Sequence, residues 1–282
     1  MQLIQSPGEI LAKMKALKRD ALRVGLVPTM GALHEGHKAL VDQSVKDNDI
    51  TVTSIFVNPT QFNNPEDLAR YPKTLEADLH KLKEWHCDIV FAPNDQDIYP
   101  KRPIIKLEFG KLSEVLEGEF RPGHFNGVGI IVMKLLNLVM PDKAYFGLKD
   151  FQQYLIVKEL VANFSVPSEI VGIPIQRLKS GVAISSRNQN LSSEGLLVAA
   201  NIYRGLEKAR ELILGNRSIT DTINLTKDFY RSIAGLEIEY FEIVDPETLQ
   251  KTDKWNHESI LLSVAGYVEG VRLIDNLYLQ PD

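Results

Sequence analysis

The stretch Val27-Pro28-Thr29-Met30-Gly31-Ala32-Leu33-His34-Glu35-Gly36-His37 decides how the first part of this chain folds. The apolar run that leads into it, from Val24 to Val27, predicts a buried strand that ends at Pro28. Gly31 permits a tight turn after the strand. Apolar residues then recur at helical spacing, at Leu40, Val41 and Val45. A strand, a turn and a helix are therefore expected in succession.

Two histidines lie where the expected turn meets the helix. His34 falls in the turn and His37 at the helix N-terminus, where free backbone N–H groups and the helix dipole attract anions. Two imidazoles at this place can donate to a phosphate and stabilise the charge that develops during its transfer. We interpret the stretch as a cradle for a triphosphate. A surface turn with two incidental histidines is the alternative, since His-Glu-x-His is one residue short of the zinc-protease pattern.

Strands and helices alternate along the rest of the first part of the chain. Further strands are expected at 50–57, 88–92, 104–109, 143–146 and 169–175, with helices at 7–17, 75–82, 112–116 and 128–139. This alternation is typical of an α/β fold with a Rossmann-like, doubly wound parallel sheet. We therefore predict a first domain at 1–176 that binds the nucleotide.

The pattern changes after about residue 190. Two helices are expected at 193–214 and 219–233, followed by three strands at 238–244, 260–268 and 271–279. This order predicts a smaller C-terminal α+β domain at 177–282, with a polar loop at its start.

The composition limits the function. A net charge of −5 over 282 residues, with a pI near 5.8, argues against a nucleic-acid-binding face. The single cysteine, Cys87, excludes an internal disulfide and a cysteine metal cluster, and is expected to be a buried structural thiol. No signal peptide or membrane-spanning run is evident, so we expect a cytoplasmic protein with no membrane partner.

Four polar segments follow expected strands or interrupt helices and are candidates for a site. They are 58–65, 117–127, 147–153 and 176–188. The second is expected to be a mobile loop that closes over a ligand. In the third, Asp150 and Gln153 fit a helix capping box, which is the alternative to a role in binding. Lys149 there opposes the helix dipole, which favours an anion nearby.

Several motifs, in order, resemble those of one enzyme family. His34-Glu35-Gly36-His37 resembles the H-x-G-H motif of the nucleotidylyltransferase superfamily, and the longer stretch is similar to that of its pantoate–β-alanine ligases, the pantothenate synthetase family. The other matches are Phe56-Val57-Asn58-Pro59-Thr60-Gln61-Phe62, Arg121-Pro122-x-His124-Phe125-x-Gly127-Val128, Gly147-x-Lys149-Asp150-x-Gln152-Gln153 and Ser185-Ser186-Arg187-Asn188. Leu148 is a departure, because many relatives carry glutamate there.

The resemblance implies that ATP drives the condensation of (R)-pantoate with β-alanine to pantothenate, AMP and diphosphate through a pantoyl adenylate. It implies that His37 and His34 are catalytic. It places ATP at Met30, Gly31, Ala32, Leu33, His34, Glu35, Gly36, His37, Gly147, Leu148, Lys149, Asp150, Gln176, Ile184, Ser185, Ser186 and Arg187. Pantoate or β-alanine is expected at Asn58, Gln61, Tyr71, Arg121, His124 and Gln153. Mg²⁺ is expected to arrive with ATP, held by phosphate oxygens and water, with no metal ligands from the protein. Relatives in this family also imply a homodimer.

Other functions remain open at the level of the sequence. A nucleotidylyltransferase that adenylates a phosphate monoester would share H-x-G-H but should lack the Gln61 and Gln153 pair. A nucleotide-binding regulator without turnover would be favoured if a histidine were missing, and neither is. A tRNA synthetase is disfavoured by the acidic charge and by the lack of room for an anticodon-binding domain.

Overall fold

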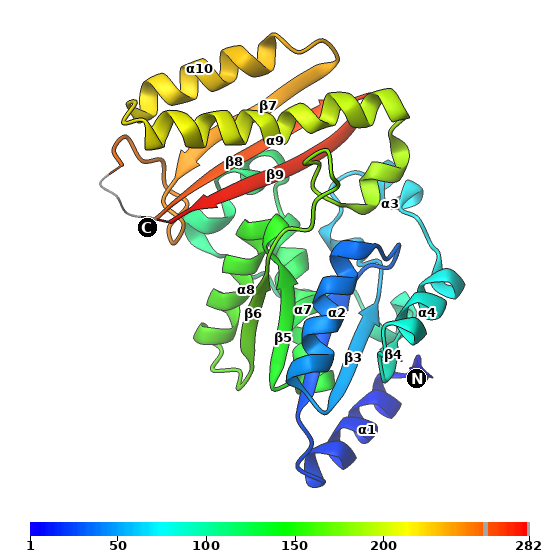
Figure 1. Cartoon of the computed structure of the whole chain (residues 1–282). Helices are drawn as coiled ribbons and strands as arrows, with labels where there is room; N and C mark the ends of the chain where they lie inside the picture. Colours follow the sequence, from blue (N-terminus) through cyan, green and yellow to red (C-terminus); the bar gives the residue numbers. More distant parts are fainter. Residues whose placement is uncertain (256–258, 281–282) are drawn as a thin grey trace.

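The computed structural model describes residues 1–255 and 259–280, which form two layered units (Figure 1). The first is built on a sheet whose strands all pair in parallel, in the order β1-β4-β3-β2-β5-β6. Its strands are β1 (Gln2–Ile4), β2 (Val24–Thr29), β3 (Ile50–Ile55), β4 (Ile89–Phe91), β5 (Lys143–Gly147) and β6 (Glu169–Ile173). Because chain order reverses on either side of β2, the sheet has a topological switch point between β2 and β5.

Helices cover both faces of the parallel sheet. The helices of this unit are α1 (Pro7–Arg19), α2 (Glu35–Asp47), α3 (Pro65–Arg70), α4 (Leu75–Glu84), α5 (Asp95–Ile98), α6 (Glu117–Phe120), α7 (His124–Val139) and α8 (Phe151–Asn163). Apolar residues of α1, α7 and α8 pack on one face, and those of α2 and α4 pack on the other. Along β5, Ala144 and Phe146 belong to the first core and Tyr145 to the second, as the alternation of side chains along a strand requires.

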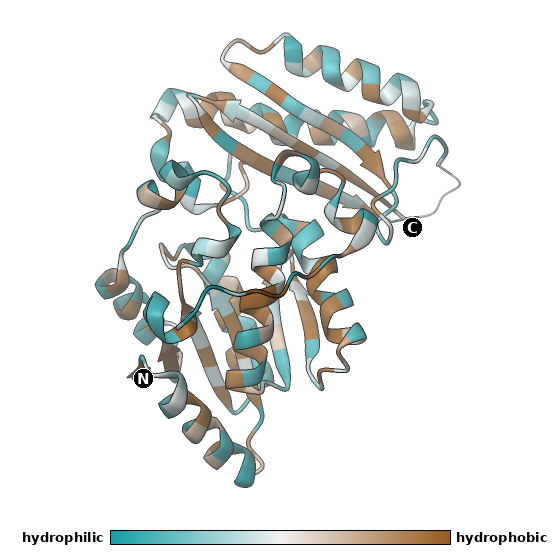
Figure 2. Ribbon diagram, turned by 180° about the vertical axis from the view of Figure 1, so that it is seen from behind, coloured by the Kyte–Doolittle hydropathy of each residue, from teal (hydrophilic) through white to brown (hydrophobic). Residues whose placement is uncertain are grey.

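The second unit is a three-stranded antiparallel sheet, β7 (Leu236–Val244), β8 (Ile260–Val268) and β9 (Val271–Leu279). The helices α9 (Ser193–Leu214) and α10 (Ile219–Arg231) pack on one face of it. Its other face meets Leu116 and Phe151 of the first unit. Figure 1 shows this sheet above the carboxyl ends of the parallel strands. The surface helices are hydrophilic on one side and hydrophobic on the other (Figure 2).

Most sequence predictions of secondary structure are confirmed, and α9, β8 and β9 have the predicted bounds. The predicted strand at 104–109 is wrong. That segment has no regular structure, and Ile104 and Ile105 are exposed, so no neighbouring strand covers it. The sheet instead ends at the short strand β1, which the sequence analysis missed. The fold class is as predicted, whereas the domain boundary at 176/177 stays a prediction.

Two local predictions need correction or refinement. The strand β2 does not end at Pro28 but continues to Thr29. It pairs with β5 only at Gly25 and Leu26, so Pro28 needs no hydrogen-bonding partner on that side. The segment expected as one mobile loop contains α6 and the first turn of α7. Cys87 is buried as expected, and burial raises the pKa of its thiol. None of the described helices is long and apolar enough to cross a membrane.

Candidate functional site

The candidate site is a cleft of about 240 Å³ at the switch point, where β2 and β5 have separated beyond Leu26. Open parallel sheets bind ligands at this place because loops from both sides diverge there. Every motif contributes to the cleft lining, and the motif that contains Arg121 does so through Val128. The predicted site residues that line the cleft are Met30, His34, Gly36, His37, Asn58, Gln61, Tyr71, Gly147, Lys149, Asp150, Gln153, Gln176, Ile184, Ser185, Ser186 and Arg187.

The turn between β2 and α2 brings both histidines to this cleft. Gly31 and Ala32 have φ of +81° and +50°, a left-handed pair that reverses the chain and that is unfavourable for alanine. His34 is then the N-cap of α2, and His37 is in its first turn. The sequence analysis expected His37 at the helix start, and the structure adds that His34 caps the helix.

The caps of α2 set the tautomers of the two histidines. The Nδ1 atom of His34 accepts from the backbone N–H of Gly36 at 3.1 Å, and the Nδ1 atom of His37 accepts from that of His34 at 3.3 Å. An imidazole nitrogen that accepts a hydrogen bond carries no proton, so in the neutral rings the proton lies on Nε2. The two ring centroids are 4.1 Å apart. The pair therefore presents two neighbouring N–H donors.

Burial and nearby positive charges favour the neutral form of both rings. Burial, followed by the charges of Lys149 and Lys81, lowers the pKa of His34 to about 4. Burial and the neighbouring His34 lower the pKa of His37 well below its usual value. A bound polyphosphate would raise both pKa values, because an opposite charge favours the protonated form. The positively charged surroundings thus favour an anion at the histidine pair.

Helix α4 supports the turn from behind. The buried Asp78 carboxylate accepts from the backbone N–H groups of Ala32 at 2.9 Å and Leu33 at 2.8 Å, and from the Thr74 hydroxyl at 3.0 Å. Lys81, in the next turn of α4, donates to the carbonyl of Leu33. Sequence analysis missed both residues, because an acid and a lysine on an amphipathic helix look like ordinary surface residues.

The motif after β3 forms a second wall. Asn58 is buried and donates to the Gln61 side chain at 3.0 Å and to the Gly127 carbonyl at 3.1 Å. The Tyr99 hydroxyl donates to the side-chain Oδ1 of Asn58 at 2.9 Å. A Cβ at Gly127 would collide with the Thr60 carbonyl, so only glycine lets α7 approach this closely. Asn58 is thus held by the protein, and it orients Gln61 in the cleft.

The two glutamines at the start of α8 have different roles. Asp150 is the N-cap of α8 but makes no side-chain cap, so the capping box with Gln153, the alternative to a role in binding, does not form. Among the described residues, no hydrogen bond engages the Gln153 amide, which lines the cleft. Gln152 is buried instead, and it accepts from the Glu117 backbone N–H at 3.0 Å and donates to the carbonyls of Leu112 and Val115 at 2.7 and 2.8 Å. Gln153 is therefore available to a ligand, whereas Gln152 anchors α6.

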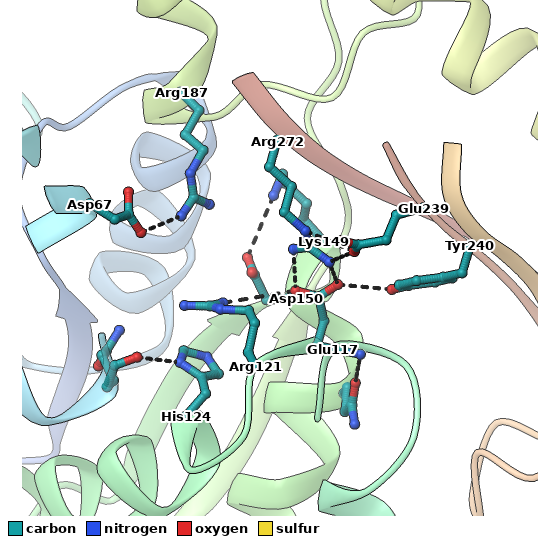
Figure 3. Close-up of polar contacts among 12 residues, drawn as sticks. Asp67, Glu117, Arg121, His124, Lys149, Asp150, Arg187, Glu239, Tyr240 and Arg272 are labelled. Atoms are coloured by element: carbon teal, nitrogen blue, oxygen red, sulfur yellow. Dashed lines mark hydrogen bonds and ion pairs between the residues drawn. The ribbon is translucent and has the colours of Figure 1, made fainter. Parts of the chain in front are cut away.

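The C-terminal sheet anchors the loop that carries Lys149. Asn276 of β9 donates to the carbonyls of Leu148 and Lys149, both at 2.9 Å. Its neighbour Asp275 is paired with Arg177 at 2.6 and 2.9 Å. These contacts place Lys149 and Asp150 at the cleft, where Lys149 Nζ lies 3.9 Å from Asp150 Oδ2 (Figure 3).

The polar loop at the start of the second unit covers the other side of the cleft. Ser185 and Asn188 form a reciprocal cap on the 3-10 turn η4 (Ser186–Asn190), with the Ser185 N–H donating to Asn188 at 2.6 Å. The Arg187 guanidinium reaches Asp67 of α3 at 3.5 Å (Figure 3). The Ile184 N–H donates to the Gln176 carbonyl at 2.9 Å, so these two residues close the base of the loop.

Arg121 and His124 lie in a small polar cavity that adjoins the cleft and shares Lys149, Asp150 and Gln153 with it. His124 is buried, and its Nδ1 atom is 2.8 Å from the Gln61 carbonyl. Burial, followed by the charge of Arg121, lowers the pKa of His124 to about 4. His124 is thus neutral at pH 7 beside an arginine.

Some predicted ATP-binding residues do not line the cleft. Gly31, Ala32 and Leu33 are buried behind the histidines, Glu35 is exposed, and Leu148 packs beside Gly172. Their expected contacts with ATP stay a prediction. Within residues 1–255 and 259–280, no group of three or more His, Cys, Asp or Glu is arranged to hold a metal ion.

Comparison with known proteins finds the same family that the sequence motifs resemble. The family model described as pantoate-beta-alanine ligase matches residues 2–278. The chain is 46% identical over 264 residues to a pantothenate synthetase of Cytophaga hutchinsonii, covering 93% of each, and 45% identical over 278 residues to one of Bacteroides fragilis, covering 98% of each.

Solved structures show the same relationship. A pantothenate synthetase from Thermus thermophilus has a TM-score of 0.93 at 40% identity, with both chains covered completely. A pantoate-beta-alanine ligase from Francisella tularensis, solved with beta-gamma ATP and beta-alanine, has a TM-score of 0.82 at 34% identity, again with complete coverage.

Proposed function

This chain belongs to the pantoate–β-alanine ligase family, whose members make pantothenate with ATP, and on this basis we propose how its cleft divides the reaction between its residues. The observation that carries the proposal is the histidine pair with its two Nε2–H donors at a cleft that also contains the Gln153 amide, to which no described residue donates or accepts a hydrogen bond. The histidine pair suits a polyphosphate, and the Gln153 amide suits a hydroxy acid.

The first step is adenylation of pantoate. A pantoate carboxylate oxygen attacks the α-phosphorus of ATP, the bond to the bridging oxygen breaks, and pyrophosphate leaves with its electrons. His34 and His37 donate to the phosphates, and Lys149 and Arg187 neutralise their charge, because phosphoryl transfer needs positioning and charge stabilisation above all. We assign His37 the larger catalytic role, since it lies in the first turn of α2.

The amides hold pantoate. Gln61 and Gln153 each offer a donor and an acceptor, which suits a molecule with hydroxyls and a carboxylate. Asn58 fixes the Gln61 side chain, and Tyr71 lines the same cleft. Asp150, which carries the only carboxylate among the described residues of the cleft, is assigned to the ribose hydroxyls.

The second step joins β-alanine. Its amine attacks the acyl carbon of the adenylate, the bond from that carbon to the phosphate oxygen breaks, and AMP leaves while the amine loses a proton. We assign the β-alanine carboxylate to Arg121, with the neutral His124 beside it, because Arg121 lines the adjoining cavity and its guanidinium lies 3.8 Å from Glu117, too far for a hydrogen bond. Arginine binds carboxylates with a fork of N–H donors.

We further propose that ATP brings Mg²⁺ on its phosphates, and that the ion adds charge neutralisation there. Such an ion would be coordinated by phosphate oxygens and water. The resemblance also supports a homodimer and a place in the cytoplasm, where ATP is available.

Isotope exchange between ATP and pyrophosphate tests the assignment. Exchange should require pantoate and proceed without β-alanine. A need for β-alanine would refute the adenylate intermediate. Exchange supported by a phosphate monoester and not by pantoate would favour the alternative nucleotidylyltransferase.

A further inference from the structure

An ionic cluster joins α6 to the C-terminal sheet (Figure 3). The Glu117 carboxylate accepts from Arg272 Nη1 at 2.7 Å and from Arg272 Nη2 at 2.8 Å, a bidentate pair. The Tyr240 hydroxyl donates to the same carboxylate at 2.9 Å. The Arg272 Nε atom also donates to Glu239 at 3.0 Å. Only 11% of the Glu117 side chain and 17% of the Arg272 side chain are exposed, so water could make few of these hydrogen bonds in their place.

The cluster keeps Glu117 ionised. Burial would raise the pKa of this carboxyl group, but the hydrogen bonds and charge of Arg272 outweigh burial and lower the pKa. Burial would likewise lower the pKa of Arg272, and the two carboxylates raise it instead. The charged carboxylate of Glu117 thus lies at the edge of the site, and Arg272 is its main ion-pair partner.

Arg121 is the second guanidinium within reach of that carboxylate. Its Nη1 atom is 3.8 Å from Glu117 Oε2, too far for a hydrogen bond, and its backbone N–H donates to the Glu117 carbonyl at 2.9 Å. Among the described residues no other ion pair involves Arg121. Both oxygens of Glu117 are already engaged, so the Arg121 donors stay directed to the cavity that they line with His124 and Lys149.

We propose that Arg272 is a positioning residue, which keeps Arg121 available to substrate by occupying Glu117. The proposal rests on the assignment of Arg121 to the β-alanine carboxylate. Without Arg272, the buried carboxylate would lack its main counter-charge, a state that buried charges do not tolerate. Arg121 is near enough to replace the lost partner with a small movement, and a guanidinium paired with Glu117 no longer presents its fork to β-alanine.

The test compares four variants: Arg272→Met, Glu117→Gln, the double variant and Arg121→Met. For each, the KM for β-alanine and kcat are measured at saturating ATP and pantoate, together with pantoate-dependent ATP–pyrophosphate exchange. Arg272→Met should raise the KM for β-alanine about tenfold, the effect of one charge-assisted hydrogen bond, and leave the exchange unchanged. Adding Glu117→Gln should lower that KM again, because the carboxylate that captures Arg121 is gone.

The controls separate the possible failures. Arg231→Met removes an exposed arginine of α10 whose ion pair, among the described residues, is with Asp228 of the same helix. It should change neither the KM for β-alanine nor the ATP–pyrophosphate exchange. A merely structural role for Arg272 would lower stability or kcat without a rescue by Glu117→Gln, which would overturn the proposal. If Arg121→Met raises the KM for β-alanine but Arg272→Met does not, the positioning role is wrong. If Arg121→Met has no effect, the assignment of Arg121 itself is wrong.

Arg272→Lys serves if the methionine variant does not fold. A single ammonium group cannot bridge both oxygens of Glu117. The KM for β-alanine should therefore still rise, to a smaller extent, and Glu117→Gln should again reverse it. An unchanged KM in a folded Arg272→Lys variant would contradict the proposal.

Discussion

Asp78 and Leu33 are joined through the backbone of the histidine turn. The carboxylate of Asp78 accepts the Leu33 N–H at 2.8 Å, while Lys81 from the same helix donates to the Leu33 carbonyl. One helix therefore holds both backbone polar groups of the residue that immediately precedes His34. The turn carries a left-handed alanine, so its shape depends on these bonds.

Asp78→Ala should destabilise the protein and slow adenylation. It leaves the buried N–H groups of Ala32 and Leu33 without an acceptor, which costs about 1–3 kcal/mol for each group. Urea denaturation and pantoate-dependent pyrophosphate exchange measure the two effects. Glu84→Ala, at an exposed position of the same helix, is the matched control and should change neither. Normal exchange in a destabilised Asp78→Ala protein would show that the turn keeps its shape without this carboxylate.

His37→Ala should impair the first half-reaction alone. The loss of one donor aimed at developing charge typically slows a reaction by roughly 10²–10³. No pyrophosphate leaves in the second step, so pantoyl adenylate supplied to the variant should react with β-alanine at a near-normal rate. Single-turnover measurements compare the two steps, with His80→Ala on the exposed side of α4 as control. Equal slowing of both steps would mean that His37 shapes the whole cleft.

The adjacent glutamines provide a pair of opposite predictions. Gln153→Ala should reduce turnover with pantoate and leave the free energy of unfolding almost unchanged, because no described residue bonds to this amide. Gln152→Ala should lower the free energy of unfolding by about 1–3 kcal/mol, since it leaves the buried Glu117 N–H without its acceptor and removes the donor to the carbonyls of Leu112 and Val115. Kinetics with varied pantoate and thermal denaturation distinguish them. If Gln153→Ala instead lowered the free energy of unfolding and Gln152→Ala reduced turnover with pantoate, the roles assigned to the two glutamines would have to be exchanged.

Stability should fall as the pH falls from about 6.5 to about 4. His124 has a pKa of about 4 in the folded protein, lowered by burial and by Arg121, and near 6.5 when unfolded. Within this window the unfolded chain binds the proton and the folded protein does not, so the stabilisation present above pH 6.5 is lost. His124→Asn should reduce the slope by up to about 1.4 kcal/mol per pH unit. Equal slopes in the unmodified and His124→Asn proteins would exclude a buried neutral His124.

The homodimer expected from the resemblance should be visible in solution. Exposed Ile104 and Ile105, which no described element covers, offer apolar surface for a second copy. Sedimentation velocity should give twice the mass of the chain at micromolar concentration. A single species of monomer mass over that range would count against it.

The sequence predicted most of the first sheet and the main motifs, because apolar periodicity and glycine–proline punctuation are local signals. It did not predict how distant residues share contacts. Glu117 reads as part of a polar loop, and its burial depends on Gln152 and Arg272, which lie far along the chain. Asp150 and Gln153 have the spacing of a capping box, yet that box does not form. Pro28 suggested that β2 ends there, because proline lacks a backbone N–H. The strand continues past Pro28 because its pairing with β5 has already stopped, and this topology is not visible in the sequence.

The contacts of β9 bear on the order in which the molecule matures during synthesis. Arg272 reaches α6 and Asn276 reaches the Lys149 loop, yet both belong to the strand that is translated after every other described element. Domains generally fold as they emerge, N-terminal parts first. The histidine turn, α4 and the parallel sheet can therefore form early as an incomplete enzyme. Its catalytic competence then depends on the late docking of a single strand, because β9 holds both the loop that carries Lys149 and the Glu117 cluster.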